Sequence, residues 1–309
     1  MTRIFIDGSA GTTGLRIRER LEAREDVELL AISEELRKDA AERKRMLNAA
    51  DVVFLCLPDD AAREAVAMIE NPDTVVIDAS TAHRTLDGWC YGLPELSAER
   101  AEKLKTAKRI AVPGCHASGF IALVYPLVKA GYLPADACLT CTSLTGYSGG
   151  GKKMIAEYEA GGNVLLSAPR QYGISQQHKH LKEMKAITGL SVSPIFLPIV
   201  ADFYSGMEVT VPLFASQLAD GIGIEEIRAL YRSTYDTPIL FYAEDADEAG
   251  FLSAAAMSGK DSMQVSVHGN EDRILLVARY DNLGKGASGA AIECLNAVLG
   301  ADPCTGLVI

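Results

Sequence analysis

Three glycines near the start of the chain constrain the fold more than any other feature. Gly8, Gly11 and Gly14 follow a short β-type run and precede a helical pattern of apolar residues. Glycines in such a turn let the backbone bend tightly against a pyrophosphate, while the helix N-terminus offers N–H groups and a positive dipole. The turn therefore predicts a dinucleotide site. Its expected contacts are Gly8, Ser9, Gly11, Thr12, Thr13 and Gly14.

The segments after this turn alternate between strand-like and helix-like patterns. Residues 27–32, 51–58 and 74–80 read as strands, and charged or amphipathic helical stretches separate them. This rhythm predicts a doubly wound parallel sheet, a Rossmann domain over residues 1–114. The alternative is an α/β domain whose glycines only turn the chain.

The pattern changes after residue 115. Residues 206–214 alternate apolar and polar side chains, and residues 263–280 read as two strands around a turn at 269–272. Such antiparallel pairs predict a second domain, built of α and β elements, over residues 115–283. The closing amphipathic helix lies within residues 284–309, and we expect it to return to the first domain.

The choice between NAD and NADP stays open from the local sequence. An NAD site usually has an acid near the end of the second strand, where Glu34 follows Ser33. Arg37 and Lys38 lie just beyond, and an exposed serine with nearby cations suits a 2′-phosphate. Ser33, Arg37 and Lys38 are therefore the candidates for NADP, and Glu34 for a ribose hydroxyl.

Charge and cysteine content limit the partners. The formal net charge is −11, which argues against a nucleic-acid or anionic-membrane partner. No apolar run reaches membrane-spanning length, and the N-terminal run is too short for a signal peptide. Seven cysteines, an odd number scattered through a long chain, indicate reduced thiols and a cytoplasmic location. We expect a small-molecule substrate, no metal and a homo-oligomer, either a dimer or a tetramer.

Cys115 is the candidate nucleophile. It follows a β run and a Pro-Gly break, and the apolar segment after it predicts a helix that is bent or interrupted at Pro126. A thiol at a helix N-terminus meets the positive end of the dipole, which favours the thiolate. The alternative is a buried turn cysteine. The other cysteines considered, expected to be small buried hydrophobes, are Cys56, Cys138, Cys141 and Cys294.

His116, next to Cys115, raises the question of an adjacent Cys-His pair. Neighbouring residues on a strand or a helix point in different directions, so the His116 ring is not expected to face the sulfur. His116 as the base is the less favoured alternative.

Seven blocks of sequence indicate a family. They are GSAGTTG, IDASTAHR, YGLPEL, VPGCHASG, TGYSGGGKK, QQHKHLKEM and NLGKGASGAAIECLN. In order and spacing, from Gly8 to about Leu299, the chain resembles the short form (type 2) of the N-acetyl-γ-glutamyl-phosphate reductases. The resemblance implies an NADPH-dependent acyl-phosphate reductase of arginine biosynthesis. It also implies a Rossmann domain with an α+β catalytic domain of the glyceraldehyde-3-phosphate dehydrogenase type.

The same resemblance implies roles for individual residues. It makes Cys115 the nucleophile that forms a thioester. His178 and His180 match the family's His-Arg-His stretch, and we favour His180 as the acid–base group with His178 as second choice. The alternatives are a pair of surface histidines or a His-x-His metal site, for which no third ligand is evident. In many relatives an aromatic residue stands where His116 does.

The substrate's phosphate and carboxylate need cationic or N–H partners. The candidates for substrate binding are Ser80, Arg84, Ser148, Gly149, Gly150 and Lys152. The resemblance also implies that a further set of residues binds the cofactor, namely Asn282, Lys285 and Gly286. The alternative for each set is an ordinary loop.

Several rival functions use parts of the same pattern. An aspartate-semialdehyde dehydrogenase would share the architecture and the thioester chemistry, but its nucleophile usually follows an Asn, whereas Gly114 precedes Cys115 here. Reductases of carrier-protein-bound acyl phosphates are also close. A dinucleotide-binding sensor would need no reactive thiol, and a Cys-His hydrolase would leave the glycine turn without a role.

Overall fold

The computed structural model describes residues 1–37 and 39–309, which form two compact units. The first unit contains residues 1–94, 99–113 and 287–307. The second contains residues 95–98, 114–286 and the last two residues. The chain therefore changes units between Pro113 and Gly114, directly before Cys115, and again between Gly286 and Ala287.

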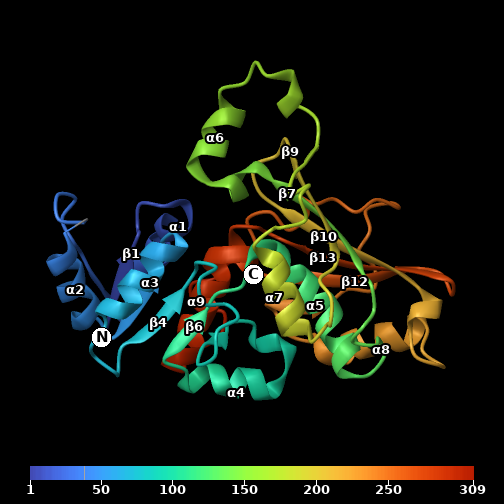
Figure 1. The fold of residues 1–309 in the computed structure, drawn as a ribbon, viewed down its shortest axis with the longest axis horizontal. Helices are drawn as coiled ribbons and strands as arrows, with labels where there is room; N and C mark the ends of the chain where they lie inside the picture. Colours follow the sequence, from blue (N-terminus) through green and yellow to red (C-terminus); the bar gives the residue numbers. More distant parts are fainter. Residues whose placement is uncertain (38) are drawn as a thin grey trace. The chain divides into compact units, whose positions relative to one another are not determined.

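The first unit is built on a parallel sheet with strand order β2-β1-β3-β4-β6-β5 (Figure 1). Its strands are β1 (Thr2–Asp7), β2 (Val27–Leu30), β3 (Val52–Leu55), β4 (Val75–Asp78), β5 (Cys90–Tyr91) and β6 (Arg109–Ala111). Its helices are α1 (Thr12–Glu22), α2 (Ala40–Ala49), α3 (Asp59–Met68), α4 (Ala98–Thr106) and α9 (Gly289–Leu299). The Rossmann expectation is confirmed by this order and by the parallel pairing.

Apolar side chains cover both faces of this sheet. On β1, Ile4 and Ile6 pack in one core with α1 and α9, whereas Phe5 packs in a second core with α2 and α3. Burial on both faces explains why these strands read as continuous apolar runs rather than as alternating ones. The last helix, α9, contributes Ile292 and Leu295 to the first of these cores.

The second unit contains a mixed sheet with strand order β11-β12-β13-β10-β7-β9-β8. Its strands are β7 (Thr140–Gly146), β8 (Arg170–Gln171), β9 (Ile195–Ala201), β10 (Met207–Phe214), β11 (Leu240–Tyr242), β12 (Met263–Gly269) and β13 (Arg273–Tyr280). Its helices are α5 (Cys115–Lys129), α6 (Gly151–Glu159), α7 (His180–Thr188) and α8 (Ile224–Thr234). In Figure 1 the segment that carries α6 projects from the ends of β7 and β9.

The alternation expected of β10 is confirmed, because Met207, Val209, Val211 and Leu213 are buried between more exposed neighbours. The antiparallel pair β12–β13 also forms as expected, around the turn at residues 270–272. Helix α5 is apolar on all sides and buried along most of its length. Because the helix is packed on all sides, the position of its first residue, Cys115, is set by the second unit.

Of the two outcomes expected at Pro126, a bend or an interruption, the interruption is wrong, because helix α5 continues through this residue. Proline lacks the N–H that would bond to the carbonyl of Ala122. The Tyr235 hydroxyl donates to that carbonyl at 2.5 Å, so the helix continues to Lys129. The expected burial of Cys138 is wrong: Cys138 is exposed, because β7 begins only at Thr140.

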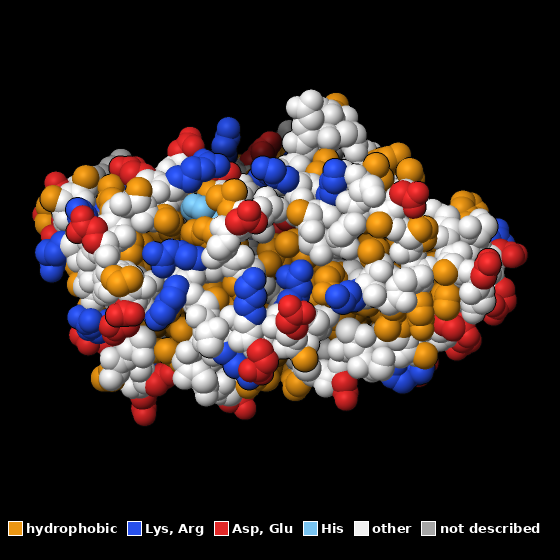
Figure 2. Space-filling view, turned by 60° about the horizontal axis from the view of Figure 1, so that its bottom comes forward, with side chains coloured by type: hydrophobic (Ala, Val, Ile, Leu, Met, Phe, Trp, Pro, Cys, Tyr) orange, Lys and Arg blue, Asp and Glu red, His pale blue; other side chains and the backbone are white. Residues whose placement is uncertain are grey.

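Figure 2 shows acidic and basic side chains intermixed on the face that it draws. Among the described residues, none of the helices combines the length and the apolar character that crossing a membrane would require.

Candidate active site

At two positions of the glycine turn between β1 and α1, neighbouring backbone atoms leave no room for a side chain. Gly8 has a φ of 90°, and a Cβ at this position would overlap the carbonyl oxygen of Cys56. A Cβ on Gly14 would lie 2.5 Å from the carbonyl oxygen of Gly8. Gly11 is the N-cap of α1, whose first turn holds no acidic side chain. The turn therefore fits a bound pyrophosphate, which needs glycines and N–H donors there.

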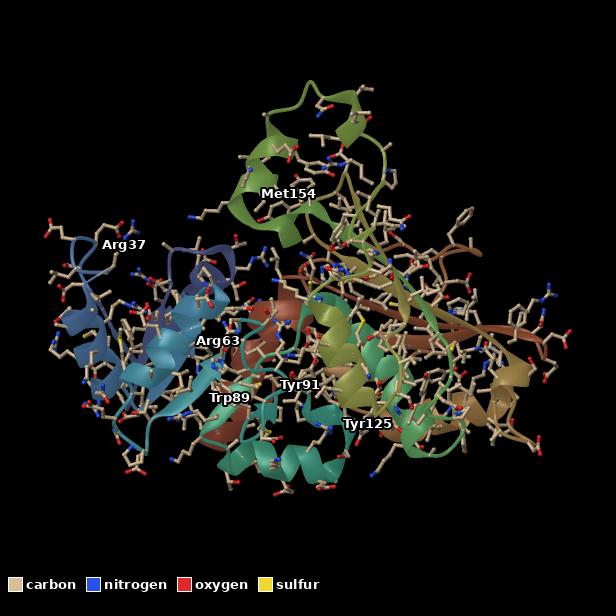
Figure 3. All side chains as sticks on the ribbon, in the orientation of Figure 1. Arg37, Arg63, Trp89, Tyr91, Tyr125 and Met154 are labelled. Atoms are coloured by element: carbon tan, nitrogen blue, oxygen red, sulfur yellow. The ribbon has the colours of Figure 1, made fainter. Side chains whose placement is uncertain are left out.

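Of the residues after β2 that were considered for the 2′-phosphate, Ser33 and Arg37 are exposed. Arg37 (labelled in Figure 3) forms an ion pair with Glu34 at 2.7 Å, and the carbonyl of Ser33 accepts a bond from a neighbouring backbone amide. Lys38 lies outside the described residues. Surface ion pairs contribute about 0–1 kcal/mol, so Glu34 holds Arg37 only weakly.

The loop after β4 is organised by a buried carboxylate. Asp78 accepts bonds from the Ser80 amide at 2.9 Å, the Ser80 hydroxyl at 2.7 Å and His83 Nδ1 at 2.6 Å. The His83 ring stacks on Trp89 with a centroid separation of 4.1 Å. The side chain of Ser80 thus binds within its own loop.

Arg84 is also buried and binds the protein itself. Its Nε donates to the carbonyl of Val112 at 2.9 Å, and its Nη2 donates to the carbonyl of Ala79 at 3.1 Å. Arg84 therefore holds the loop after β4 to the segment that precedes Pro113. In this structure Ser80 and Arg84, both expected to bind substrate, support the backbone.

Cys115 is the first residue of α5, and Gly114 is the N-cap. The hydroxyl of Tyr280 contacts both ends of the first turn: it donates to the carbonyl of Cys115 and accepts from the amide of Gly119 at 3.0 Å. A Cβ on Gly119 would lie 2.7 Å from this hydroxyl oxygen. Burial raises the pKa of Tyr280 well above its usual value, so it remains a donor. Tyr280 thus fixes the turn that carries the thiol at a helix N-terminus, where the dipole favours thiolate.

We expect Tyr280→Phe to lower the free energy of unfolding by about 1–3 kcal/mol, because buried backbone groups would lose a partner. Urea titration followed by circular dichroism measures this change. Tyr204→Phe is the matched control, because Tyr204 is 42% exposed. Equal unfolding midpoints for Tyr280→Phe and wild type would show that the hydroxyl does not support the turn.

Helix α7 places an acid and a histidine beside the start of α5. Glu183 is buried, and its Oε2 accepts a bond from the amide of Gly114 at 3.1 Å. Its Oε1 lies 4.0 Å from Nε2 of His180, one helical turn earlier. His180 is itself buried. Glu183 therefore connects His180 with the loop that presents Cys115.

His178 and His180 lie in one aromatic cluster with His116. The ring centroids of His178 and His180 are 4.7 Å apart, and those of His116 and His180 are 5.6 Å apart. The Nδ1 of His178 accepts a bond from the amide of His180 at 3.2 Å. This bond occupies one nitrogen of His178 at the start of α7.

Hydroxyl groups occupy both nitrogens of His116. Nδ1 lies 2.6 Å from Oγ of Ser143, and Nε2 lies 2.6 Å from the hydroxyl oxygen of Tyr172. Burial, with a smaller contribution from the charge of His178, lowers the pKa of His116 to about 3. A neutral ring held in this way is a poor acid–base group for the neighbouring Cys115.

The glycine-rich segment after β7 meets the loop after β13. Asn282 Nδ2 donates to Oγ of Ser148 at 3.0 Å, and Asn282 Oδ1 accepts from the amide of Gly206 at 2.9 Å. Ser148 is buried, whereas Gly149, Gly150 and Lys152 are exposed. Two residues that were expected in different roles, Ser148 and Asn282, are thus hydrogen-bonded to each other.

Lys285 is buried, and its ammonium group donates to Glu95 Oε1. The next residue, Gly286, lies against Cys115, since a Cβ on Gly286 would be 3.1 Å from the Cβ of Cys115. The ion pair of Lys285 and Glu95 therefore supports the turn beside Cys115. Within the described residues, no group of His, Cys, Asp and Glu has the arrangement of a metal site.

Family models match both parts of the chain. The semialdehyde dehydrogenase NAD binding domain matches residues 3–104, and the semialdehyde dehydrogenase dimerisation domain matches residues 115–282. Curated relatives match nearly the whole length. The N-acetyl-gamma-glutamyl-phosphate reductase 2 of Nostoc sp. is 44% identical and covers 96% of this chain and 97% of its own. The N-acetyl-gamma-glutamyl-phosphate reductase of Chelativorans sp. is 45% identical and covers 96% and 98%.

The chain belongs to the N-acetyl-gamma-glutamyl-phosphate reductase family.

Solved structures share the fold of this reductase family member. Aspartate semialdehyde dehydrogenase II of Vibrio cholerae, complexed with ASA, has a TM-score of 0.73 at 17% identity and covers 97% of this chain and 98% of its own. Aspartate semialdehyde dehydrogenase of Candida albicans, with NADP, has a TM-score of 0.63 at 14% identity, covering 97% and 99%. These likenesses confirm the expected two-part fold.

Several residues around the reductase's Cys115 were not found from the sequence. They are Glu95, Ser143, Tyr172, Glu183 and Tyr280. Only Glu183 carried a local signal, because it lies three residues after His180 and such spacing places two side chains on one helix face.

Proposed function

We propose that this chain catalyses the NADPH-dependent reduction of N-acetyl-γ-glutamyl phosphate to N-acetyl-glutamate 5-semialdehyde in arginine biosynthesis. The observation that carries the proposal is the 43–45% identity to reductases of that name over at least 96% of the chain. The position of Cys115 at the N-terminus of α5 supports it, because acyl-phosphate reduction through a thioester needs an activated thiol.

In the proposed mechanism the Cys115 thiolate attacks the acyl carbon. The S–C bond forms, and inorganic phosphate leaves with the electron pair of the C–O bond. NADPH, when bound, supplies the hydride that reduces the resulting thioester. The C–S bond then breaks to release the semialdehyde and restore the thiolate. Covalent capture on Cys115 holds the carbonyl carbon in place throughout.

We assign to His180, which Glu183 positions, the proton of the Cys115 thiol: the imidazole accepts this proton when the attacking thiolate forms. This histidine is buried, lies 4.0 Å from the carboxylate of Glu183, and shares its cluster with His178. His178 is the second choice, because its Nδ1 already accepts the amide bond of α7.

A reverse assay tests the function. Purified protein with N-acetyl-glutamate 5-semialdehyde, inorganic phosphate and NADP should produce NADPH, read by absorbance. Aspartate semialdehyde, offered in its place, should be turned over far more slowly. Faster turnover of aspartate semialdehyde would favour the rival dehydrogenase whose fold is shared. Binding of NADPH with no turnover of either aldehyde would favour the sensor.

We infer that NADP is the physiological cofactor and that Arg37 contacts its 2′-phosphate. A charge-assisted hydrogen bond contributes about 1.5–3 kcal/mol, so Arg37→Ala should lower kcat/KM for NADPH roughly tenfold or more and leave that for NADH unchanged. Glu34→Gln is the control, and it should not lower kcat/KM for NADPH, because it releases Arg37 from its ion pair. If NADH equals or exceeds NADPH with the wild type, Glu34 rather than Arg37 contacts the ribose.

We also infer a homo-oligomer, a dimer or a tetramer, formed through the second unit. The matching of residues 115–282 to a dimerisation domain supports this. So do Phe214 and Leu275, which are 62% and 40% exposed on the sheet face opposite to buried Leu213 and Ile274. We place the protein in the cytoplasm, because an odd number of cysteines scattered along a long chain favours reduced thiols.

A further inference from the structure

A short chain of hydrogen bonds passes through His116, the residue directly after Cys115. It begins at Ser143 on β7, passes through the ring of His116 and ends at the hydroxyl of Tyr172, with both separations at 2.6 Å. Ser143 is 0% exposed and His116 is 3% exposed. Neither hydroxyl is bonded to a second group of the protein among residues 1–37 and 39–309. The direction of the chain can therefore be worked out from the donors and acceptors.

The ring of His116 is neutral, since burial lowers its pKa to about 3. A neutral imidazole has one donor nitrogen and one acceptor nitrogen. The buried hydroxyl of Ser143 must donate its hydrogen, and Nδ1 of His116 is the acceptor within reach. Nε2 therefore carries the ring hydrogen and donates it to the oxygen of Tyr172.

The oxygen of Tyr172 thus accepts a bond, and its own hydrogen is directed away from His116. Burial raises the pKa of Tyr172, and the charge of Cys115 raises it further, so the phenol stays protonated and lies within electrostatic reach of the thiolate. The side chain of Tyr172 packs against the buried cluster of Tyr158, Leu166 and Val200, as do Tyr147 and Met154, the latter labelled in Figure 3. Tyr172 is a fixed donor near the nucleophile.

We propose that the Tyr172 hydroxyl donates a hydrogen bond to the carbonyl oxygen of the acyl group carried on Cys115. His116 and Ser143 are positioning residues that set the direction of this bond. The inference rests on the proposed thioester function. Negative charge gathers on that oxygen when the thiolate attacks and again when hydride adds, and a preoriented donor stabilises it most at those moments. Tyr172 keeps its proton, because the charge returns to the C=O bond when phosphate or thiolate leaves.

Tyr172→Phe tests the donor, because it keeps the ring and removes only the hydroxyl. Loss of one such donor typically costs about 10²–10³ in kcat, and we expect this fall with little change in KM for the acyl phosphate. Tyr204→Phe is the matched control and should keep the wild-type rate. His116→Gln retains an N–H donor and should keep more activity than His116→Leu.

A spectroscopic experiment tests the hydrogen bond from Tyr172 without NADPH or phosphate. Acylation with carbonyl-¹³C p-nitrophenyl acetate places an acetyl thioester on Cys115, and Cys115→Ala provides the background from other thiols such as the exposed Cys138. Infrared difference spectra should show a higher carbonyl stretching frequency in Tyr172→Phe than in the wild type or in Tyr204→Phe, because the oxygen loses its donor.

The outcomes separate the two proposals. A wild type that is acylated at Cys115 but reduces no N-acetyl-γ-glutamyl phosphate contradicts the proposed function, and the carbonyl frequency still decides the role of Tyr172. An unchanged frequency in Tyr172→Phe overturns the hydrogen bond, even if the rate falls. A shifted frequency together with a lowered kcat supports it.

Discussion

Cys115→Ala and Cys115→Ser should each abolish turnover and leave NADPH binding near normal. Both changes remove the thiolate that must form the S–C bond, and an alcohol at the same helix N-terminus is a far weaker nucleophile at neutral pH. Neither change alters the glycine turn between β1 and α1, which belongs to the other unit of the structure. Steady-state rates and fluorescence titration with NADPH measure the two effects separately.

Cys138→Ala is the matched control for these variants. Cys138 is exposed, so its replacement should change neither the rate nor the binding of NADPH. Retention of more than a few per cent of the wild-type rate in both Cys115 variants would rule out the thioester mechanism. A parallel loss of NADPH binding would instead indicate damage beyond the thiol.

The sequence was informative wherever a role depends on local backbone geometry. The glycine turn and the placement of Cys115 at a helix start could both be predicted, because the turn residues and the apolar helix are contiguous in the chain. The sheet of the first unit followed from the alternation of strands and helices. These features depend on short-range sterics and on periodicity, which one sequence displays.

The surroundings of Cys115 could not be predicted in the same way. Tyr172 and Tyr280 reach this site from positions 56 and 165 residues away from their hydrogen-bond partners. The positions of these two tyrosines depend on the strand order of the second sheet, for which the sequence contains no local signal. The continuation of α5 through Pro126 has the same origin, since a distant tyrosine accommodates the carbonyl that proline leaves without a donor.

His180→Asn should lower kcat by at least about a hundredfold, because loss of a positioned acid–base group typically costs 10²–10⁴ in rate. Asparagine keeps a polar side chain of similar size but cannot exchange a proton near neutral pH. The pH–rate profile supplies the distinguishing measurement: the variant should lose a limb that the wild type shows. His116 cannot produce that limb near neutrality, because burial lowers its pKa to about 3.

Two further variants locate the proton-transfer role within the cluster. His178→Asn should be milder than His180→Asn, since an asparagine oxygen can still accept the amide bond that His178 Nδ1 accepts now. Glu183→Gln should lower kcat, because the amide can accept from Gly114 yet lacks the charge that stabilises an imidazolium on His180. If His178→Asn alone is damaging and His180→Asn retains its pH limb, the proton is transferred by His178, and the thioester mechanism on Cys115 stands unchanged.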